Sequence, residues 1–164
     1  MSTDTIKEFL REFSFETFLE ELLPELAPLL EKSALITRLL LLIGPFVILG
    51  MGLYYFLNAP KEANFQSGYR CYWGMGSVQA WRFTQRLAGG LWTLLGLGFA
   101  VWFALKGPEL AAMELMDRMT RTAVYILCQA VSLLLLRWII NFLVFLRYDA
   151  KGNRRYTWAE LWRG

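Results

Sequence analysis

The side chains best suited to binding chemistry gather in one stretch, GYRCYWGMGSVQAWRFTQRLAGG, at residues 68–90. It contains three arginines, two tryptophans and two tyrosines between two apolar runs. A guanidinium group presents a planar set of donors that matches carboxylate and phosphate groups. Arg70 and Arg86 could therefore converge on one anionic group, such as a lipid phosphate or a partner's carboxylate. They could equally bond carbonyl groups within the loop and hold its shape, and the sequence leaves both interpretations open.

A second set of polar side chains lies within the last apolar run of the chain. Gln129, Arg137 and Asn141 are eight and four residues apart, which places all three on one face of a helix. A charged group near the centre of a bilayer costs about 2.5–3.5 kcal/mol on insertion scales, so Arg137 should face protein or water. It either holds helices together or snorkels towards the helix end, or else it forms a site for an anionic ligand or lipid head group.

The residues that most enzymes and metal sites require are missing. The chain has no histidine, and its two cysteines, Cys71 and Cys128, fall in a loop and in an apolar run. No nucleophile stands beside a plausible base, and the glycine pairs at residues 50–52 and 74–76 do not complete a dinucleotide fingerprint. We therefore expect no enzyme, no cofactor and no metal. The basic, aromatic tail at residues 148–164 should contact anionic lipid rather than nucleic acid.

Three long apolar runs must position these side chains. Hydrophobic residues make up 56% of the 164-residue chain. As helices, residues 34–57, 88–105 and 123–146 would rise about 36, 27 and 36 Å, which is close to or above bilayer thickness. The sequence predicts an all-α polytopic membrane bundle with three transmembrane helices, a membrane domain at residues 34–147 and the tail that follows it.

An acidic amphipathic helix is predicted before the first span, at residues 5–23, within a segment that ends near residue 33. Thr5 and Glu8 form a capping box, and apolar residues recur at helical spacing opposite a face of glutamates. Pro24 and Pro28 should end this helix. It lies either on lipid or the bundle, or it docks onto a partner.

The second span is expected to continue a helix that begins in the loop. Ser77 can cap a helix that starts near Val78, and Trp81, Gln85 and Ala88 would share one face of it. Further along, small residues recur every fourth position, a spacing that lets helix backbones approach closely. This spacing favours packing within the bundle, with a homodimer as the alternative, through Gly96, Ala100 and Ala104.

The basic residues near the spans predict an orientation. Three spans place the loop at residues 58–87 and the tail on the same side, which carries nine lysines and arginines against five on the other side near the spans. Because cytoplasmic loops are enriched in these residues, the N-terminus should be outside and the C-terminus inside.

The loop also carries a motif that resembles the hallmark of the SdpI family of small bacterial integral membrane proteins. The similarity covers residues 45–105 and departs from the family at Ala63, where proline is usual, at Cys71, where threonine is usual, and at Gln85, where asparagine or histidine is usual. The chain is also shorter than the founding member. The matching residues are Asn64, Gly68, Tyr69, Arg70, Trp81, Gln85, Arg86 and Gly89.

The resemblance implies a multi-pass protein of the bacterial cytoplasmic membrane. The founding member of the family is an immunity protein against a secreted peptide toxin and takes part in signalling to a repressor. We therefore expect an immunity or signalling role, with membrane lipids and a toxic peptide or a regulatory membrane protein as partners. The alternatives are a non-catalytic subunit or assembly factor of a membrane complex, and a small transporter with Arg137 as its anion site.

Overall fold

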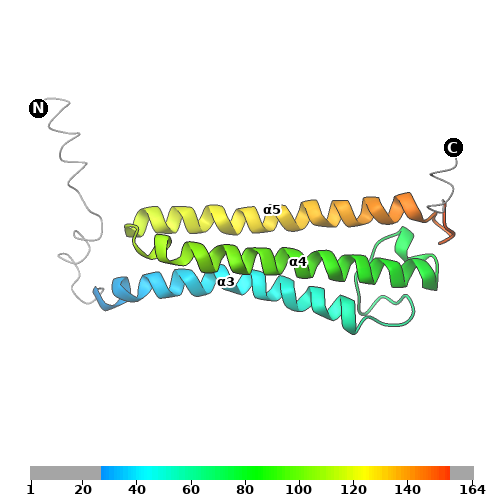
Figure 1. Ribbon diagram of the computed structural model, residues 1–164, viewed down its shortest axis with the longest axis horizontal. Helices are drawn as coiled ribbons and strands as arrows, with labels where there is room; N and C mark the ends of the chain where they lie inside the picture. Colours follow the sequence, from blue (N-terminus) through cyan, green and yellow to red (C-terminus); the bar gives the residue numbers. More distant parts are fainter. Residues whose placement is uncertain (1–26, 156–164) are drawn as a thin grey trace, which may run out of the picture. The chain divides into compact units, whose positions relative to one another are not determined.

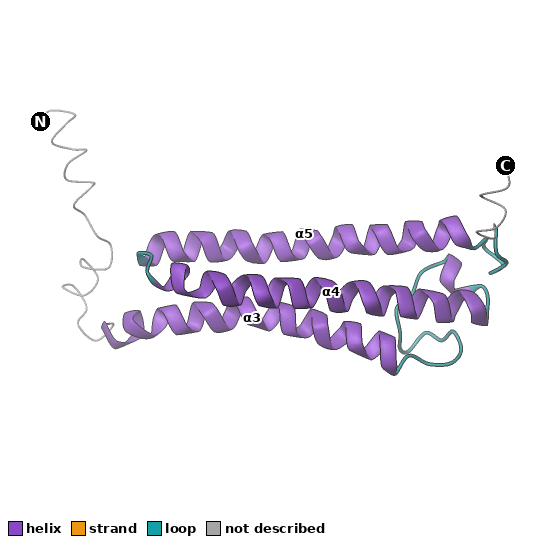
Figure 2. Cartoon of the chain, viewed as in Figure 1, coloured by secondary structure: helices purple, strands orange, loops and turns teal. Residues whose placement is uncertain are grey.

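Three long helices make up most of the described chain. The computed structural model describes residues 27–155, with side chains from Lys32 onward. Figure 1 shows the helices α3 (Ala27–Leu57), α4 (Val78–Ala111) and α5 (Leu115–Arg147). Within residues 27–155 the remaining regular structure is a single 3₁₀ turn, η2 (Trp73–Met75), and an isolated bridge between Tyr148 and Arg154 (Figure 2).

All three helices are long and apolar enough to cross a membrane, which confirms the predicted fold class. Each candidate span, Lys32–Leu57, Val78–Ala111 and Leu115–Arg147, contains an 18-residue window whose mean hydropathy is 2.2, 1.7 and 2.0, respectively. Each helix is longer than the apolar run from which it was predicted. The difference is largest for α4, because this helix begins at Val78, in the polar turns that precede residue 88. Hydropathy alone marks the segment that lies in lipid, whereas backbone hydrogen bonding continues into the interfacial turns.

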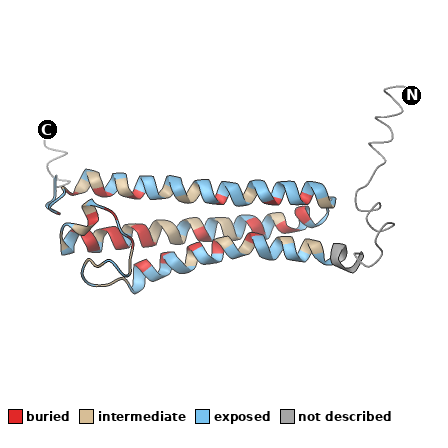
Figure 3. Cartoon of the chain, turned by 180° about the vertical axis from the view of Figure 1, so that it is seen from behind, coloured by how far each residue is buried: buried red, intermediate tan, exposed pale blue. Residues whose placement is uncertain are grey.

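Exposed residues lie along all three helices (Figure 3), and many of them are large and apolar. Leu57 is 70% exposed, Leu105 is 74% exposed and Trp138 is 79% exposed. Such a surface is unfavourable in water, because roughly 25 cal/mol is lost for each Å² of apolar surface left hydrated. A hydrocarbon environment removes this cost, so the exposed apolar surface also supports an integral membrane protein.

The N-terminal end of α3 accommodates a proline. The helix begins at Ala27, so Pro28 stands in its first turn, where the missing N–H has no helical partner to lose. Pro45 lies in the helix interior and is fully buried. The predicted amphipathic helix at residues 5–23 and most of the C-terminal tail lie outside the described residues.

The contacts divide the chain into two units, and the first contains the described residues 27–43 and 101–127. In it, the side chain of Arg38 lies against α4, where a Cβ added at Gly107 would be 3.2 Å from its Nε atom. The rings of Phe103 and Tyr125 pack with their centroids 5.6 Å apart. Because Gly107 has no side chain, the side chain of Arg38 has room to lie against α4 at this position.

The second unit contains residues 44–100 and 128–155, and it positions the candidate site. Here the loop at residues 58–77 folds beside the first turns of α4, at the end where α5 finishes (Figure 1). Every element of the unit contributes to one buried cluster, which is formed by Tyr55 of α3, Tyr69 and Cys71 of the loop, Ala80 and Ala88 of α4, Ile140 and Val144 of α5, and Tyr148.

Candidate ligand-binding site

The loop between α3 and α4 turns back through an asparagine and a glycine. The Asn64 side-chain oxygen accepts hydrogen bonds from the backbone N–H groups of Gln66 and Ser67, at 3.0 and 2.9 Å. Gly68 follows with a φ of +92°, a conformation that side-chain-bearing residues rarely adopt. A Cβ at this position would also lie 2.7 Å from the Trp81 ring. The turn therefore has both a local hydrogen-bonding cause and a steric requirement for glycine.

A single buried amide then fixes the next residue of the loop. Gln85 of α4 accepts a hydrogen bond from the Tyr69 N–H at 2.8 Å and donates one to the Tyr69 carbonyl at 2.7 Å. Because Gln85 is only 3% exposed, both backbone groups of Tyr69 would otherwise be buried without partners. The amide at position 85 thus holds the loop onto α4.

The start of α4 is anchored in the way the sequence predicts. Ser77 Oγ accepts a hydrogen bond from the Ala80 N–H at 3.2 Å, and the helix begins at Val78. The predicted shared face of Trp81, Gln85 and Ala88 lies within α4, and the structure shows that all three residues are buried. The Trp81 indole nitrogen donates to the Pro60 carbonyl at 2.7 Å and so ties the beginning of the loop to the same helix.

The Ser77 hydroxyl also connects this region to the turn that follows α5. It donates a hydrogen bond to the Gly152 carbonyl at 2.8 Å. Gly152 has a φ of +78°, and a Cβ there would lie 2.5 Å from the Ser77 nitrogen. Asp149 shapes the turn by accepting hydrogen bonds from the backbone N–H groups of Lys151 and Asn153, and these bonds lower the pKa of its exposed carboxyl group.

Tyr69 links the loop to α5. Its hydroxyl lies 3.1 Å from the Asn141 side-chain oxygen and 3.3 Å from the Arg137 carbonyl, so its one proton is donated to one of these acceptors at a time. Its ring packs edge-on against Tyr55 and Trp92. Burial raises the pKa of Tyr69 to about 12, so the hydroxyl remains a donor throughout the physiological pH range.

A cavity of about 330 Å³ opens beside Tyr69, and two arginines line it. Arg70 comes from the loop and Arg137 from α5. Arg70 Nη1 donates to the Phe65 carbonyl at 2.9 Å, and neither arginine forms an ion pair with a carboxylate within the described residues. The remaining walls are aromatic and aliphatic, with Tyr55, Gly68, Tyr69, Trp92, Leu133 and Leu134.

The predicted convergence of Arg70 with Arg86 is not what the structure shows. Arg86 lines a different cavity, of about 290 Å³, together with Lys61 and Arg82. The path of the loop explains the difference, because Gln85 holds the Tyr69 backbone while the Tyr69 side chain bonds to α5. Arg70 is thereby directed to the cavity that Arg137 also lines. The hydrogen bond of Arg70 to Phe65 agrees with the loop-holding interpretation, whereas its contact with an anionic group stays a prediction.

The three polar residues predicted on one face of the last span have three different surroundings. Gln129 is buried against Gly44 of α3, where any Cβ would overlap its side-chain oxygen. Asn141 meets the Tyr69 hydroxyl, whereas the Arg137 side chain is exposed and lines the cavity. Gln129 and Asn141 therefore connect α5 to the rest of the unit, and Arg137 retains donors for another group.

Two glycines of α4 allow close packing against α3. A Cβ at Gly89, one of the motif residues, would lie 2.6 Å from the Phe56 nitrogen, and one at Gly96 would lie 2.6 Å from the Leu49 nitrogen. Both glycines thus allow α3 and α4 to approach closely within one chain, as the bundle interpretation predicts. Ala100 is half-buried and Ala104 is exposed.

Sequence reasoning missed one contributor to this region. Trp92 lines the cavity, and its indole nitrogen is buried without a hydrogen-bond partner among the described residues. Its position continues the buried face of Trp81, Gln85 and Ala88 by one more helical step, which would have identified it. Cys71 accepts a hydrogen bond from the Gly74 N–H at 3.3 Å, and burial raises the pKa of its thiol.

The described residues contain no group of three or more histidine, cysteine or acidic side chains that could hold a metal ion. The guanidinium groups that line the cavity beside Tyr69 are suited to an anionic ligand, and its aromatic and leucine walls are suited to an apolar part of that ligand. The cavity beside Tyr69 can therefore orient such a group, and it contains no residue that would supply a nucleophile and base pair.

Comparison with known proteins extends the predicted similarity. The sequence model of the SdpI/YfhL protein family matches residues 61–146, just over half of the 164-residue chain. This range begins in the loop and includes α4 and nearly all of α5, whereas the predicted resemblance ended at residue 105. No curated protein and no solved structure matches the chain significantly. With its three membrane-spanning helices and its arginine-containing loop, the chain belongs to the SdpI/YfhL protein family.

Proposed function

We propose that this membrane protein is a non-catalytic receptor with an immunity or signalling role, which binds a membrane-active peptide or a segment of a regulatory membrane protein. The observation that carries the proposal is the cavity beside Tyr69, which Arg70 and Arg137 both line without a carboxylate partner among the described residues. Family membership supports the same class of function.

The chemistry of the cavity defines the ligand. Two guanidinium groups favour a carboxylate, such as the C-terminus or an acidic side chain of a peptide. The aromatic and leucine walls favour an apolar side chain next to that carboxylate. A volume of about 330 Å³ is in the range of small ligand pockets, so it would hold the end of a peptide rather than a whole one.

The hydrogen bonds of Tyr69 support a signalling role. A ligand in the cavity would contact the loop through Arg70 and α5 through Arg137, on either side of the bond between Tyr69 and Asn141. If the ligand binds one arrangement of loop and α5 more tightly, it stabilises that arrangement. A partner protein that contacts the loop or α5 would then bind the ligand-stabilised arrangement with a different affinity.

A toxin-challenge assay tests the proposal. Cells that express the wild-type protein should survive a membrane-active peptide better than cells without it, and Arg70→Ala and Arg137→Ala should each remove most of this protection. Arg154→Ala is the matched control, since Arg154 is exposed and does not line the cavity. Membrane insertion of each variant is verified by fractionation. Wild-type protection by both cavity variants, or equal survival with and without the gene, would contradict the proposal.

The transporter alternative gains one observation, because Arg137 does line a cavity. Flux of small anions into proteoliposomes that is reduced by Arg137→Leu would support it, and flux that this change leaves unaltered would count against it.

The alternative of a complex subunit depends on the acidic helix at residues 5–23, which lies outside the described residues. Co-purification of a membrane partner that is lost when this segment is removed would favour the subunit role.

A further inference from the structure

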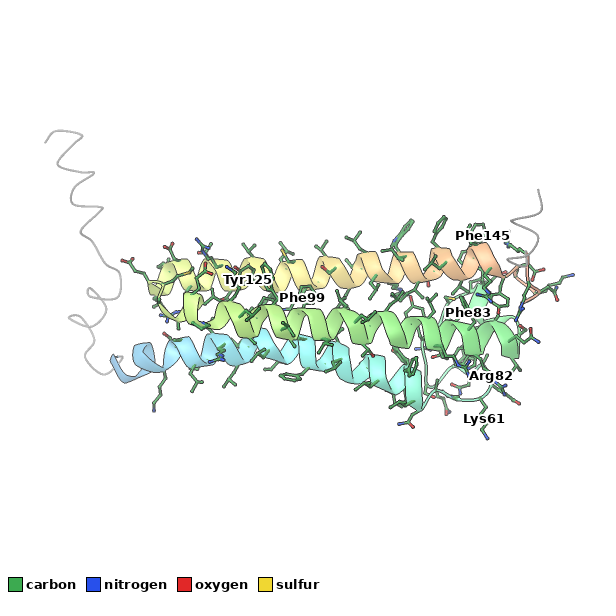
Figure 4. All side chains as sticks on the ribbon, in the orientation of Figure 1. Lys61, Arg82, Phe83, Phe99, Tyr125 and Phe145 are labelled. Atoms are coloured by element: carbon green, nitrogen blue, oxygen red, sulfur yellow. The ribbon has the colours of Figure 1, made fainter. Side chains whose placement is uncertain are left out.

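We propose that a second cavity, between the end of α3 and the first turns of α4, binds the phosphate group of an anionic phospholipid. The cavity has a volume of about 290 Å³. Three basic side chains line it: Lys61 from the loop and Arg82 and Arg86 from α4. Figure 4 shows Lys61 and Arg82 at the same end of the second unit. The cavity shares no basic residue with the cavity of Arg70 and Arg137, so this inference does not depend on the proposed function.

The positive charge of this cavity is not neutralised within the described chain. No ion pair involves Lys61, Arg82 or Arg86 among residues 32–155. Glu62 follows Lys61 in the sequence, but it is exposed and does not line the cavity. Arg82 and Arg86 are four residues apart on one helix, a spacing at which like charges repel each other. An anion between them would remove this repulsion and occupy several guanidinium donors at once.

The walls of the cavity are held in place by bonds already described. Trp81 donates to the Pro60 carbonyl, which fixes the Ala59–Pro60 wall against α4. Gln85 also lines the cavity, but both ends of its amide are used by the Tyr69 backbone. The basic side chains are therefore the groups left to bind a ligand, and they project from a backbone that does not need to rearrange.

The position of the cavity favours a lipid over a soluble phosphate. The first candidate span ends at Leu57, so the cavity lies where lipid head groups meet water. Phe56 and Leu57 line it and are 53% and 70% exposed, and Leu53, one turn earlier, is 42% exposed. Acyl chains can thus lie along this face of α3 while the phosphate reaches the basic residues. Basic pockets at the ends of transmembrane helices are suited to anionic head groups.

Lipid retention measured by native mass spectrometry tests the inference. The full chain is reconstituted in nanodiscs of phosphatidylcholine and phosphatidylglycerol, then released and analysed for bound lipid. The wild type should retain phosphatidylglycerol, and Arg82→Gln with Arg86→Gln should lower this retention roughly ten- to thirty-fold. Lys151→Gln with Arg154→Gln removes the same charge from exposed residues in the turn after α5 and should leave retention unchanged.

Two further arms make the result specific. Arg82→Lys with Arg86→Lys keeps the charge and should keep most of the retention, which separates binding from a general loss of folding. Inorganic phosphate at millimolar concentration should not displace the lipid; if it does so as well as phosphatidylglycerol itself, the ligand is a soluble phosphate and the lipid assignment is wrong. Equal retention by the wild type and the Arg82, Arg86 glutamine variant, or an equal fall in the control, overturns the site. Arg70→Ala should change protection without changing lipid retention.

Discussion

At the scale of single residues, Gly68 is a position where the loop tolerates little change. Its φ is +92°, and a methyl group added there would lie 2.7 Å from the Trp81 ring. We expect Gly68→Ala to lower the free energy of unfolding in detergent by about 2–3 kcal/mol, from left-handed backbone strain and displacement of the ring. Unfolding in sodium dodecyl sulfate measures the change. Gly90→Ala is the control, because nothing lies within 4 Å of its added methyl group. Equal stability of the two variants would contradict this account.

Gln85 tests whether the loop is held by one amide. Gln85→Leu leaves the buried N–H and carbonyl groups of Tyr69 without partners, and we expect a loss of about 2–5 kcal/mol in unfolding free energy. Gln85→Glu keeps an acceptor for the Tyr69 N–H, but only a protonated carboxyl group can also donate to the Tyr69 carbonyl. The loss of unfolding free energy should therefore be smaller than for leucine only if the introduced carboxyl group is protonated. Gln79→Leu, at an exposed position of the same helix, should be neutral. The same unfolding assay compares them, and a neutral Gln85→Leu would refute the role.

The thiol of Cys71 gives a dependence on pH. Burial raises its pKa above the ordinary thiol value of 9.0, so the neutral thiol is favoured in the folded protein. The contribution of this thiol to the free energy of unfolding is fully present below pH 9.0, the pKa in the unfolded chain. It is lost as the pH rises through the higher pKa of the folded protein. In a Cys128→Ser background, we expect a water-soluble maleimide at about pH 8, below the ordinary thiol pKa, to modify Cys71 only after the protein is unfolded. Rapid labelling of the folded protein would show that the thiol is accessible.

At the scale of elements, the sequence predicts the helices better than the contacts between them. The three spans follow from hydropathy, and the start of α4 follows from Ser77, because both signals are local. That Arg70 lines a cavity with Arg137 cannot be predicted from local signals. The path of the loop depends on a hydrogen bond between Tyr69 and Asn141, which are 72 positions apart in the sequence. Likewise, the spacing of Gln129 and Arg137 gives one helical face, but only packing against α3 and the loop decides which of them is buried.

The contact between α3 and α4 yields a prediction at this scale. Gly96→Leu would place a side chain against the Leu49 backbone, so we expect it to separate the helices and lower the unfolding free energy by at least about 2 kcal/mol. Gly98→Leu adds the same side chain to the same helix at a position with nothing within 4 Å, where lipid can accommodate it. A similar loss in both variants would mean that helix propensity, and not the helix contact, determines the effect.

At the scale of the whole molecule, the orientation in the membrane follows from the parity of the spans and the distribution of charge. Three spans place the loop at residues 58–77 and the turn after α5 on the same side, and the hydrogen bond from Ser77 to Gly152 requires this. Lysines and arginines are concentrated on that side, at Lys61, Arg70, Arg82, Arg86, Arg147, Lys151, Arg154 and Arg155. Since such residues remain in the cytoplasm, the C-terminal side should be cytoplasmic.

A fluorescent reporter and a phosphatase reporter, each fused after Gly164, test this orientation. Fluorescence without phosphatase activity is the expected result, because only the first reporter folds in the cytoplasm and only the second is active outside it. The charge balance supplies an internal check. Replacing Lys151, Arg154 and Arg155 by glutamine weakens the bias and should increase the fraction of chains with the opposite orientation, whereas replacing Lys32 and Lys106 should not. Phosphatase activity from the wild-type fusion would reverse the assignment and move both basic cavities to the outer face, where a secreted peptide would reach the Arg70 and Arg137 site without crossing the membrane.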